Sequence, residues 1–307
     1  MVRTHLGAAA VMGLLLGASS ARAILIDFRY DYDSSGFFAD QERRDRLNDA
    51  AAFFTPFLDD LAPIQPDPPI NSWTADFNNP STGAGELIDN LPVPADTLIV
   101  YVGAQNISAP GGGGPGGYGG VTADPSLSFG DTVAARGQAG ALSGTPTDFG
   151  PWGGTITFDS DAPWHFGATT AGLDSSEYDF LSVAIHELAH VLGFGIAPSW
   201  DTWRPGLGLS FNGPASVDRY GGAVPLADAE HWNFGLTDVL NGTSQEVAMD
   251  PDITVGTRKV FTRLDYAGLN DVGWVPEPTT LLLLAFGCLA ASRRVRGSSR
   301  PGASRTV

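Results

Sequence analysis

The chain has 307 residues, 43% of them hydrophobic and 10% aromatic, which is enough apolar material for one sizeable core. Its 34 acidic residues outnumber the 17 basic ones and give a net charge of −17, so the basic footprint of a nucleic-acid-binding protein is absent. The single cysteine, Cys288, lies in an apolar segment near the C-terminus. This excludes disulfides and a metal–thiolate site from the rest of the chain.

Residues 1–23 have the features of a secretory signal peptide. Arg3 precedes an apolar run over residues 6–17, and Ala21-Arg22-Ala23 forms a small-residue cleavage site. An uncleaved anchor is the alternative, but the run falls short of the roughly 20 apolar residues that span a bilayer. We therefore expect cleavage before Ile24 and a secreted protein.

The first predicted elements follow directly. Residues 24–30 alternate between apolar and polar side chains and predict a strand, whereas residues 41–61 predict an amphipathic helix, kinked or broken at Pro56. Residues 97–102 are apolar and β-branched, which is typical of a buried strand. The glycine-rich residues 111–120 lack the Lys-Ser/Thr of a phosphate loop, which favours a flexible surface loop.

A further strand is predicted at residues 155–158, followed by a loop that contains Asp159, Asp161 and His165. The two carboxylates could supply a calcium site, but solvated loop carboxylates are the simpler expectation. We expect His165 to be packed or exposed rather than to bind metal.

The next segment, residues 180–192, reads as a buried helix that carries an H-E-x-x-H motif at His186, Glu187 and His190. Residues at i and i+4 leave a helix on the same face, so both imidazoles can converge on one metal ion. Two neutral imidazoles suit Zn²⁺, and a catalytic zinc keeps one position open for water. Glu187 is placed to take the proton of that water. The motif therefore indicates zinc-dependent peptide hydrolysis.

The ends of this helix also have sequence signals. Ser176 and Asp179 are spaced as in a capping box, and Gly193 suits the position just beyond the C-terminus. A glutamate in an otherwise apolar run is costly to bury unless it has a function. Both points favour a real helix with a functional Glu187.

Gly193 extends the motif to H-E-x-x-H-x-x-G, which resembles the metzincin clan of zinc proteases. In the compact form of that pattern a third histidine follows three residues later, where this chain has Ile196. The later pair His231-Trp232 and the methionine Met249, before an Asp-Pro turn, resemble the leishmanolysin-type metzincins, in which an insertion separates the glycine from the third histidine.

That resemblance implies one catalytic Zn²⁺ with Glu187 as the general base, Met249 in the turn beneath the metal, and three ligands: His186, His190 and His231. A carboxylate third ligand, as in the thermolysin-like enzymes, is the alternative. Gly193 argues against it, because those enzymes need no turn there. The carboxylate candidates are Glu230, Glu246 and Asp201.

The rest of the domain completes the resemblance. Residues 196–230 are rich in Pro, Gly and Trp and predict a loop-heavy insertion at the rim of the cleft. Residues 155–166 resemble the edge strand and loop of the matrixin-type metzincins, where that strand pairs with extended substrate. Residues 261–274 resemble their C-terminal helix, ended by Gly273, in which we expect Tyr266 to pack rather than to assist catalysis.

The C-terminal residues 275–307 resemble a PEP-CTERM sorting signal of Gram-negative bacteria. Pro276-Glu277-Pro278 precedes an apolar segment over residues 281–291 and a basic cluster. The resemblance implies processing by an exosortase-type enzyme, transient membrane attachment, and a secreted or envelope-associated protein. An ordinary tail anchor is the alternative, but the apolar segment is short for a span.

The sequence therefore predicts a catalytic domain over residues 24–274 with an α/β fold. We expect a twisted, mostly parallel sheet, the metal-binding helix and a small irregular C-terminal subdomain, with a protein or peptide as substrate. The alternative is a non-catalytic cell-surface or biofilm-matrix protein with a structural or vestigial zinc site. Ile196 keeps that alternative open, whereas Glu187 favours the enzyme.

Overall fold

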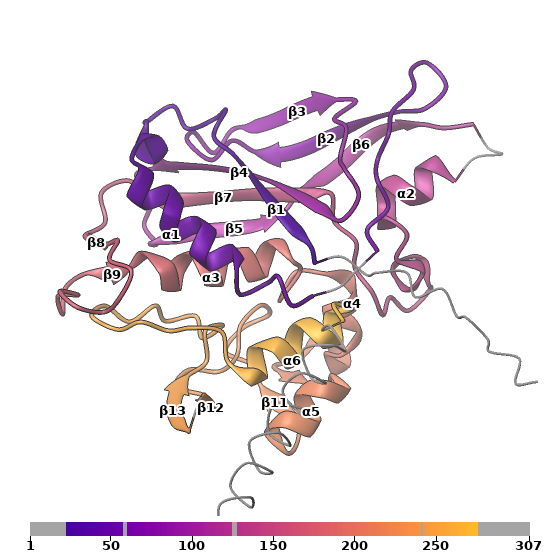
Figure 1. The fold of residues 1–307 in the computed structure, drawn as a ribbon. Helices are drawn as coiled ribbons and strands as arrows, with labels where there is room; N and C mark the ends of the chain where they lie inside the picture. Colours follow the sequence, from indigo (N-terminus) through magenta and orange to yellow (C-terminus); the bar gives the residue numbers. More distant parts are fainter. Residues whose placement is uncertain (1–22, 58–59, 125–127, 241, 276–307) are drawn as a thin grey trace, which may run out of the picture.

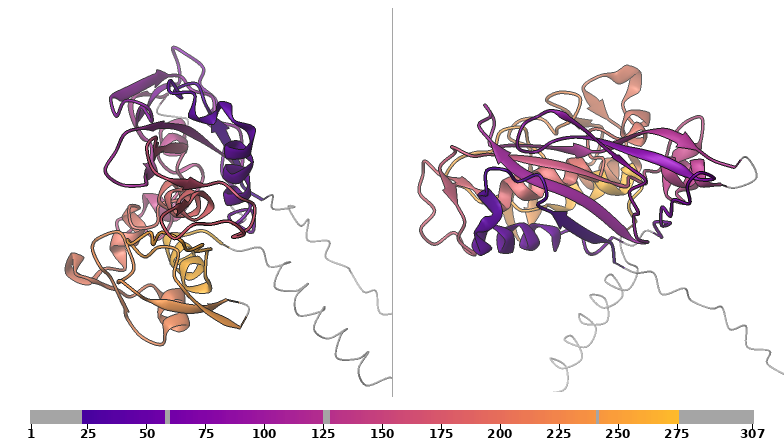
Figure 2. Two further views of the ribbon diagram at one scale, coloured as in Figure 1. Left: turned by 90° about the vertical axis from the view of Figure 1, so that its left-hand side faces the viewer. Right: turned by 90° about the horizontal axis from the view of Figure 1, so that it is seen from above.

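The computed structural model describes residues 23–57, 60–124, 128–240 and 242–275. A sheet and two flanking helices form one side of the molecule, and a C-terminal subdomain lies on the opposite side of helix α3 (Phe180–Val191), as Figures 1 and 2 show. Nearly all of the predicted leader and sorting tail lies outside the described residues. Within those residues, no helix is both long and apolar enough to cross a bilayer.

The central sheet has four strands and is mostly parallel, as predicted. Its order is β1-β4-β7-β5, with β1 parallel to β4, β4 parallel to β7, and β5 antiparallel to β7. The interior strand β4 is buried along almost its whole length because apolar side chains cover both faces. The bounds are β1 Leu25–Arg29, β4 Thr97–Gln105, β7 Gly153–Asp159 and β5 Gly111–Pro115.

Two expectations about this sheet were wrong. The glycine-rich segment is no loop, because β5 is the edge strand of the sheet, and β7, expected at the edge, is interior. The reason is close packing on the active-site helix. A Cβ at Gly111 would lie 2.8 Å from Val183 Cγ1, and one at Gly113 would lie 2.7 Å from the carbonyl oxygen of Glu187. Only glycine lets this strand lie so close to α3.

A second, antiparallel sheet of order β3-β2-β6 has no counterpart in the predictions. Its strands are β2 Ser72–Asn78, β3 Gly85–Asp89 and β6 Gly117–Thr122. A buried aromatic cluster joins it to the central sheet. In that cluster the ring of Phe77 stacks on that of Tyr101, and both meet Trp152 edge to face.

Helix α1 (Gln41–Ala51) ends well before the predicted boundary, and residues 52–56 form turns instead. Asp40 caps its N-terminus by accepting from the backbone N–H of Glu42. Helix α3 has the predicted extent, and all of its residues are buried between the sheet and the C-terminal subdomain.

The C-terminal subdomain is irregular, as predicted, but contains short helices. Trp200 stacks on Phe211 and contacts Trp232, so these aromatic rings hold the expected insertion together. The final helix is α6 (Arg263–Val272), and Tyr266 in it donates a hydrogen bond to the carbonyl oxygen of Phe53, which confirms a packing role. The other subdomain elements are α4 Pro198–Thr202, β10 Ser210–Phe211, α5 Pro214–Tyr220, β11 Val224–Pro225, β12 Thr237–Leu240 and β13 Thr243–Glu246. Along the chain, α2 Phe129–Ala135 precedes β7, and β8 Trp164–His165 and β9 Tyr178–Asp179 lie between β7 and α3.

Candidate metal centre and active site

Three histidine side chains converge at one point beside helix α3. His186 and His190 leave the same face of the helix one turn apart, and His231 follows from the segment after β11. Their Nε2 atoms lie 3.1 Å apart for His186 and His190, 3.2 Å for His186 and His231, and 3.1 Å for His190 and His231. This arrangement brings together the three residues that the sequence resemblance pointed to.

The outer nitrogen of each ring has a hydrogen-bond acceptor. The Nδ1–H groups of His186 and His190 donate to the carbonyl oxygens of Ala248 at 2.8 Å and Phe194 at 2.9 Å. That of His231 donates to the Asp228 carboxylate at 2.9 Å. All three Nε2 atoms are then unprotonated acceptors, which cannot bond to one another.

Three lone pairs pointing at one spot fit a cation. Tetrahedral Zn²⁺ with Zn–N bonds of about 2.05 Å places its nitrogen ligands about 3.3 Å apart, close to the distances found here. The backbone and carboxylate acceptors behind the rings are the partners that hold metal-bound imidazoles in their reactive tautomer. The chemistry of the donor set therefore fits zinc.

Burial keeps the imidazoles of His186 and His190 neutral. It is the main reason that the pKa of His186 falls well below its ordinary value and that of His190 falls to about 4; the neighbouring histidines lower both further. A neutral imidazole is the form that binds a metal ion. The site is therefore ready to bind a cation at neutral pH.

Glu187 lies beside the histidines at the floor of the same cleft, only 4% exposed. Burial raises the pKa of its carboxyl group to about 8, while a hydrogen bond from the backbone of Gly113 in β5 opposes that rise. A cation on the histidines would favour the ionised carboxylate further. Glu187 is thus a base placed by both the helix and the edge strand.

Two glycines make the turn that brings His231 to the helix. Gly193 has φ +94° and ends α3 as predicted, and Gly195 has φ +76°. A Cβ at Gly195 would lie 2.4 Å from the carbonyl oxygen of Glu230, so the chain around His231 packs directly against this turn. The insertion leaves the helix and returns to the same point, which explains how a histidine beyond Ile196 joins the site.

A buried carboxylate supports the segment around Met249. Asp265 in α6 accepts from the backbone N–H groups of Ala248 and Met249 and from the indole N–H of Trp232. Burial raises the pKa of Asp265 to about 6, against the effect of these donors. Through Ala248, whose carbonyl oxygen accepts from His186, this carboxylate helps to orient the histidine.

Neither Asp228 nor Asp265 was identified from the sequence. The one local signal for the latter is the spacing of Thr262 and Asp265, which form the capping box of α6. For Asp228, the only sequence signal is its position three residues before His231.

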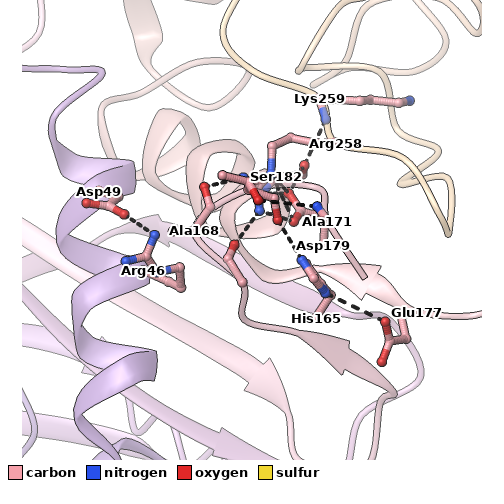
Figure 3. Close-up of polar contacts among 12 residues, drawn as sticks. Arg46, Asp49, His165, Ala168, Ala171, Glu177, Asp179, Ser182, Arg258 and Lys259 are labelled. Carbon is pink, nitrogen blue, oxygen red and sulfur yellow. Dashed lines mark hydrogen bonds and ion pairs between the residues drawn. The ribbon is translucent and has the colours of Figure 1, made fainter. Parts of the chain in front are cut away.

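Figure 3 shows the polar contacts at the start of α3. Asp179 is the N-cap itself, in place of the predicted box with Ser176; it accepts from the backbone N–H of Ser182 at 3.1 Å. Arg258 forms an ion pair with the same carboxylate at 2.6 Å. These contacts fix the helix that carries the histidines to the segment after Met249.

The other candidate ligands lie elsewhere. His165 hydrogen-bonds the carbonyl oxygen of Thr169, which confirms a packing role. It also approaches Glu177, as Figure 3 shows. Glu246 pairs with Lys259, and Asp201 pairs with Arg204. Of the carboxylate candidates, only Glu230 lines the cleft, and it is not part of the convergent group.

The proposed calcium ligands bind protein donors. Asp159 accepts from the backbone N–H groups of Ile107 and Asp161, while the Asp161 carboxylate accepts from Asn106. Solvated carboxylates stay the prediction for this loop, with calcium as the alternative.

The cleft around the histidines has a volume of about 430 Å³. Glycines of the β5 edge form one wall, and the segment after Met249 forms the other. Residues 196–230 were expected to form the rim of the cleft. This expectation was wrong for most of the segment, because Glu230 is its only residue in the described lining. The lining residues are Ser108, Ala109, Pro110, Gly111, Gly112, Gly113, Tyr178, His186, Glu187, His190, Glu230, His231, Pro251, Asp252 and Ile253.

Comparison with known proteins gives one result. The family model for matrixin matches residues 127–199, a stretch that includes all of α3 with His186 and His190 and stops before His231. Searches of curated proteins and of solved structures found no match. The matrixin match and the three-histidine group together support a zinc metalloprotease of the matrixin or metzincin type.

Proposed function

We propose that this protein is a zinc-dependent endopeptidase. The observation that carries the proposal is the convergence of three unprotonated imidazole nitrogens from His186, His190 and His231 beside the carboxylate of Glu187 in an open cleft. A bound zinc ion supplies Lewis acidity, acidifying water and polarising a carbonyl group.

The protein's own groups then account for the remaining steps. Glu187 accepts a proton from the attacking water and delivers it to the leaving amine. The Asp228 carboxylate and the carbonyl oxygen of Ala248 hold two of the imidazoles in the tautomer that leaves Nε2 free. Among the described strands, β5 has no partner on its side away from β7, and its glycines line the cleft, where an extended peptide can pair with the backbone without any particular side chain.

The rival function is a surface or matrix protein with a structural or vestigial zinc site. Structural zinc sites are closed by four protein ligands, whereas three histidines converge here and face an open cleft. A structural site also has no use for a buried carboxylate such as Glu187. Both points favour catalysis.

The localisation of the protein is proposed from the sequence alone. Residues 1–23 would direct export, and residues 275–307 would act as a sorting signal that an exosortase-type enzyme removes after transient membrane attachment. We propose that the mature protein is secreted or associated with the envelope of a Gram-negative bacterium. Mass spectrometry of the mature protein tests this: termini near Ile24 and Pro276 are expected, and an intact C-terminus would contradict sorting by cleavage.

A comparison of Glu187→Gln with wild type tests the mechanism. We expect both proteins to bind one equivalent of zinc, measured by metal analysis. The variant should hydrolyse an unfolded protein at least about 10³-fold more slowly, because removal of a residue that acts in every proton transfer costs that order of rate. Peptide hydrolysis at the wild-type rate by the variant would exclude Glu187 as the base.

A further inference from the structure

The cleft around the histidines has an unusual balance of charge. Three carboxylates line it, those of Glu187, Glu230 and Asp252, and no lysine or arginine is among its described lining residues. Even with a divalent cation on the histidines, three carboxylates leave one net negative charge. Glu230 and Asp252 are both exposed. Within the described part of the chain, neither carboxylate makes a hydrogen bond or an ion pair with another residue.

The nearby cations do not neutralise this charge. Lys259 donates to the carbonyl oxygen of Asp252 at 2.6 Å and pairs with the Glu246 carboxylate at 2.7 Å. Arg258 is committed to Asp179 at the start of α3 (Figure 3). Asp252 lines the cleft, and no ion pair to its carboxylate is found among the described residues.

A second observation makes this cleft a ligand site rather than a solvated acidic surface. His186 and His190 are each only 4% exposed, and their unpartnered Nε2 atoms point into it. The lining also includes the apolar residues Pro110 and Ile253.

We propose that Glu230 and Asp252 select peptides with a lysine or arginine side chain near the scissile bond. The inference rests on the proposed function for its substrate class, a peptide. An ammonium or guanidinium group placed in the cleft gains one or two ion pairs with these carboxylates. A neutral side chain lacks these ion pairs, and a carboxylate side chain is repelled by the like charges.

The test uses the purified full chain and three peptides that differ only in one residue beside the cleavage site: arginine, glutamine or glutamate. The variants are Glu230→Gln, Asp252→Asn and the double substitution. Asp218→Asn in α5 is the matched control, because it removes one exposed charge outside the cleft. Two readouts are measured: kcat/KM with zinc, and the dissociation constant of each peptide for the metal-free protein.

For the wild type we expect kcat/KM to be at least about tenfold higher for the arginine peptide than for the glutamate peptide, and this ratio to shrink as salt is added. The double variant should reduce the ratio to about twofold. Asp218→Asn should keep the wild-type ratio. A double variant with an unchanged ratio, or a wild type without preference for arginine, would overturn the proposal.

The binding readout separates this proposal from the proposed function. One outcome is that no peptide is cleaved, while the metal-free wild type binds the arginine peptide more tightly than the glutamate peptide and the double variant does not. This outcome would support charge selection and contradict the proposed catalysis. If peptides are cleaved with equal kcat/KM and bound equally, catalysis stands and charge selection falls.

Discussion

The glycines of β5 provide a sharp test of how the site is built. In Gly113→Ala the new Cβ would lie 2.7 Å from the carbonyl oxygen of Glu187 and 3.0 Å from its Cβ. An ordinary contact is about 3.4 Å, so the strand must retreat from α3 by roughly 0.7 Å. Overpacking of this kind costs about 1–3 kcal/mol. The retreat also weakens the hydrogen bond from Gly113 to the Glu187 carboxylate, and such a misplacement lowers kcat by about 10–100-fold.

Gly112→Ala is the matched control on the same strand. A Cβ there would meet nothing within 4 Å, and the backbone is not in the left-handed region. The entropic gain of replacing glycine, about 0.4–1 kcal/mol, is common to both variants and cancels in their comparison. Urea unfolding should therefore show Gly113→Ala to be less stable than Gly112→Ala by about 1–3 kcal/mol, with only the former impaired in kcat. Equal stability and equal kcat would refute the close packing of β5 on the helix.

Three further predictions concern zinc binding, the pH dependence of stability and the buried Arg136. Asp228→Asn should weaken zinc binding about 10–100-fold, and His231→Ala should weaken it more, as measured by competition with a chelator; equal effects would contradict the support role of Asp228. In the metal-free protein the pKa of His190 is lowered to about 4, so the unfolded chain takes up its proton first as pH falls. Stability should then be lost between about pH 6.5 and 4, by an amount on the order of 3 kcal/mol that is missing in His190→Asn; equal slopes would count against it. Arg136 is buried and donates to the carbonyl oxygens of Ala62, Thr97, Pro94 and Pro151. Each buried acceptor left unsatisfied costs about 1–3 kcal/mol, so Arg136→Met should lower the free energy of unfolding in urea by at least about 2 kcal/mol. A loss under about 1 kcal/mol would contradict the importance of these hydrogen bonds.

The active-site helix and the parallel strands of the central sheet could be predicted from short sequence patterns. The apolar run of α3, its spacing of His186 and His190 and the glycine at its end specify a buried helix that presents two imidazoles, and the structure has that helix. The three parallel strands of the central sheet also came from short apolar or alternating runs, because such runs fit a pleated, buried surface.

Contacts between distant segments account for what was missed. Glycine is depleted in strands, so residues 111–120 gave no strand signal. The close approach of β5 to α3 depends on Gly111 and Gly113, where a Cβ would collide with that helix. The partner of the His186 ring was missed for the same reason: Ala248 lies 62 residues from His186 and acts through a backbone carbonyl group that any residue possesses. His231 was identified through a family resemblance rather than through spacing.

Zinc titration of activity tests the central claim most directly. Metal-free protein would receive zinc in steps up to two equivalents, and hydrolysis of an unfolded protein would be followed at each step. A zinc endopeptidase with one site at His186, His190 and His231 should gain activity linearly, level off at one equivalent, and lose it again when a chelator is added. Tight binding of one equivalent without hydrolysis, or hydrolysis that does not depend on zinc, would contradict the account.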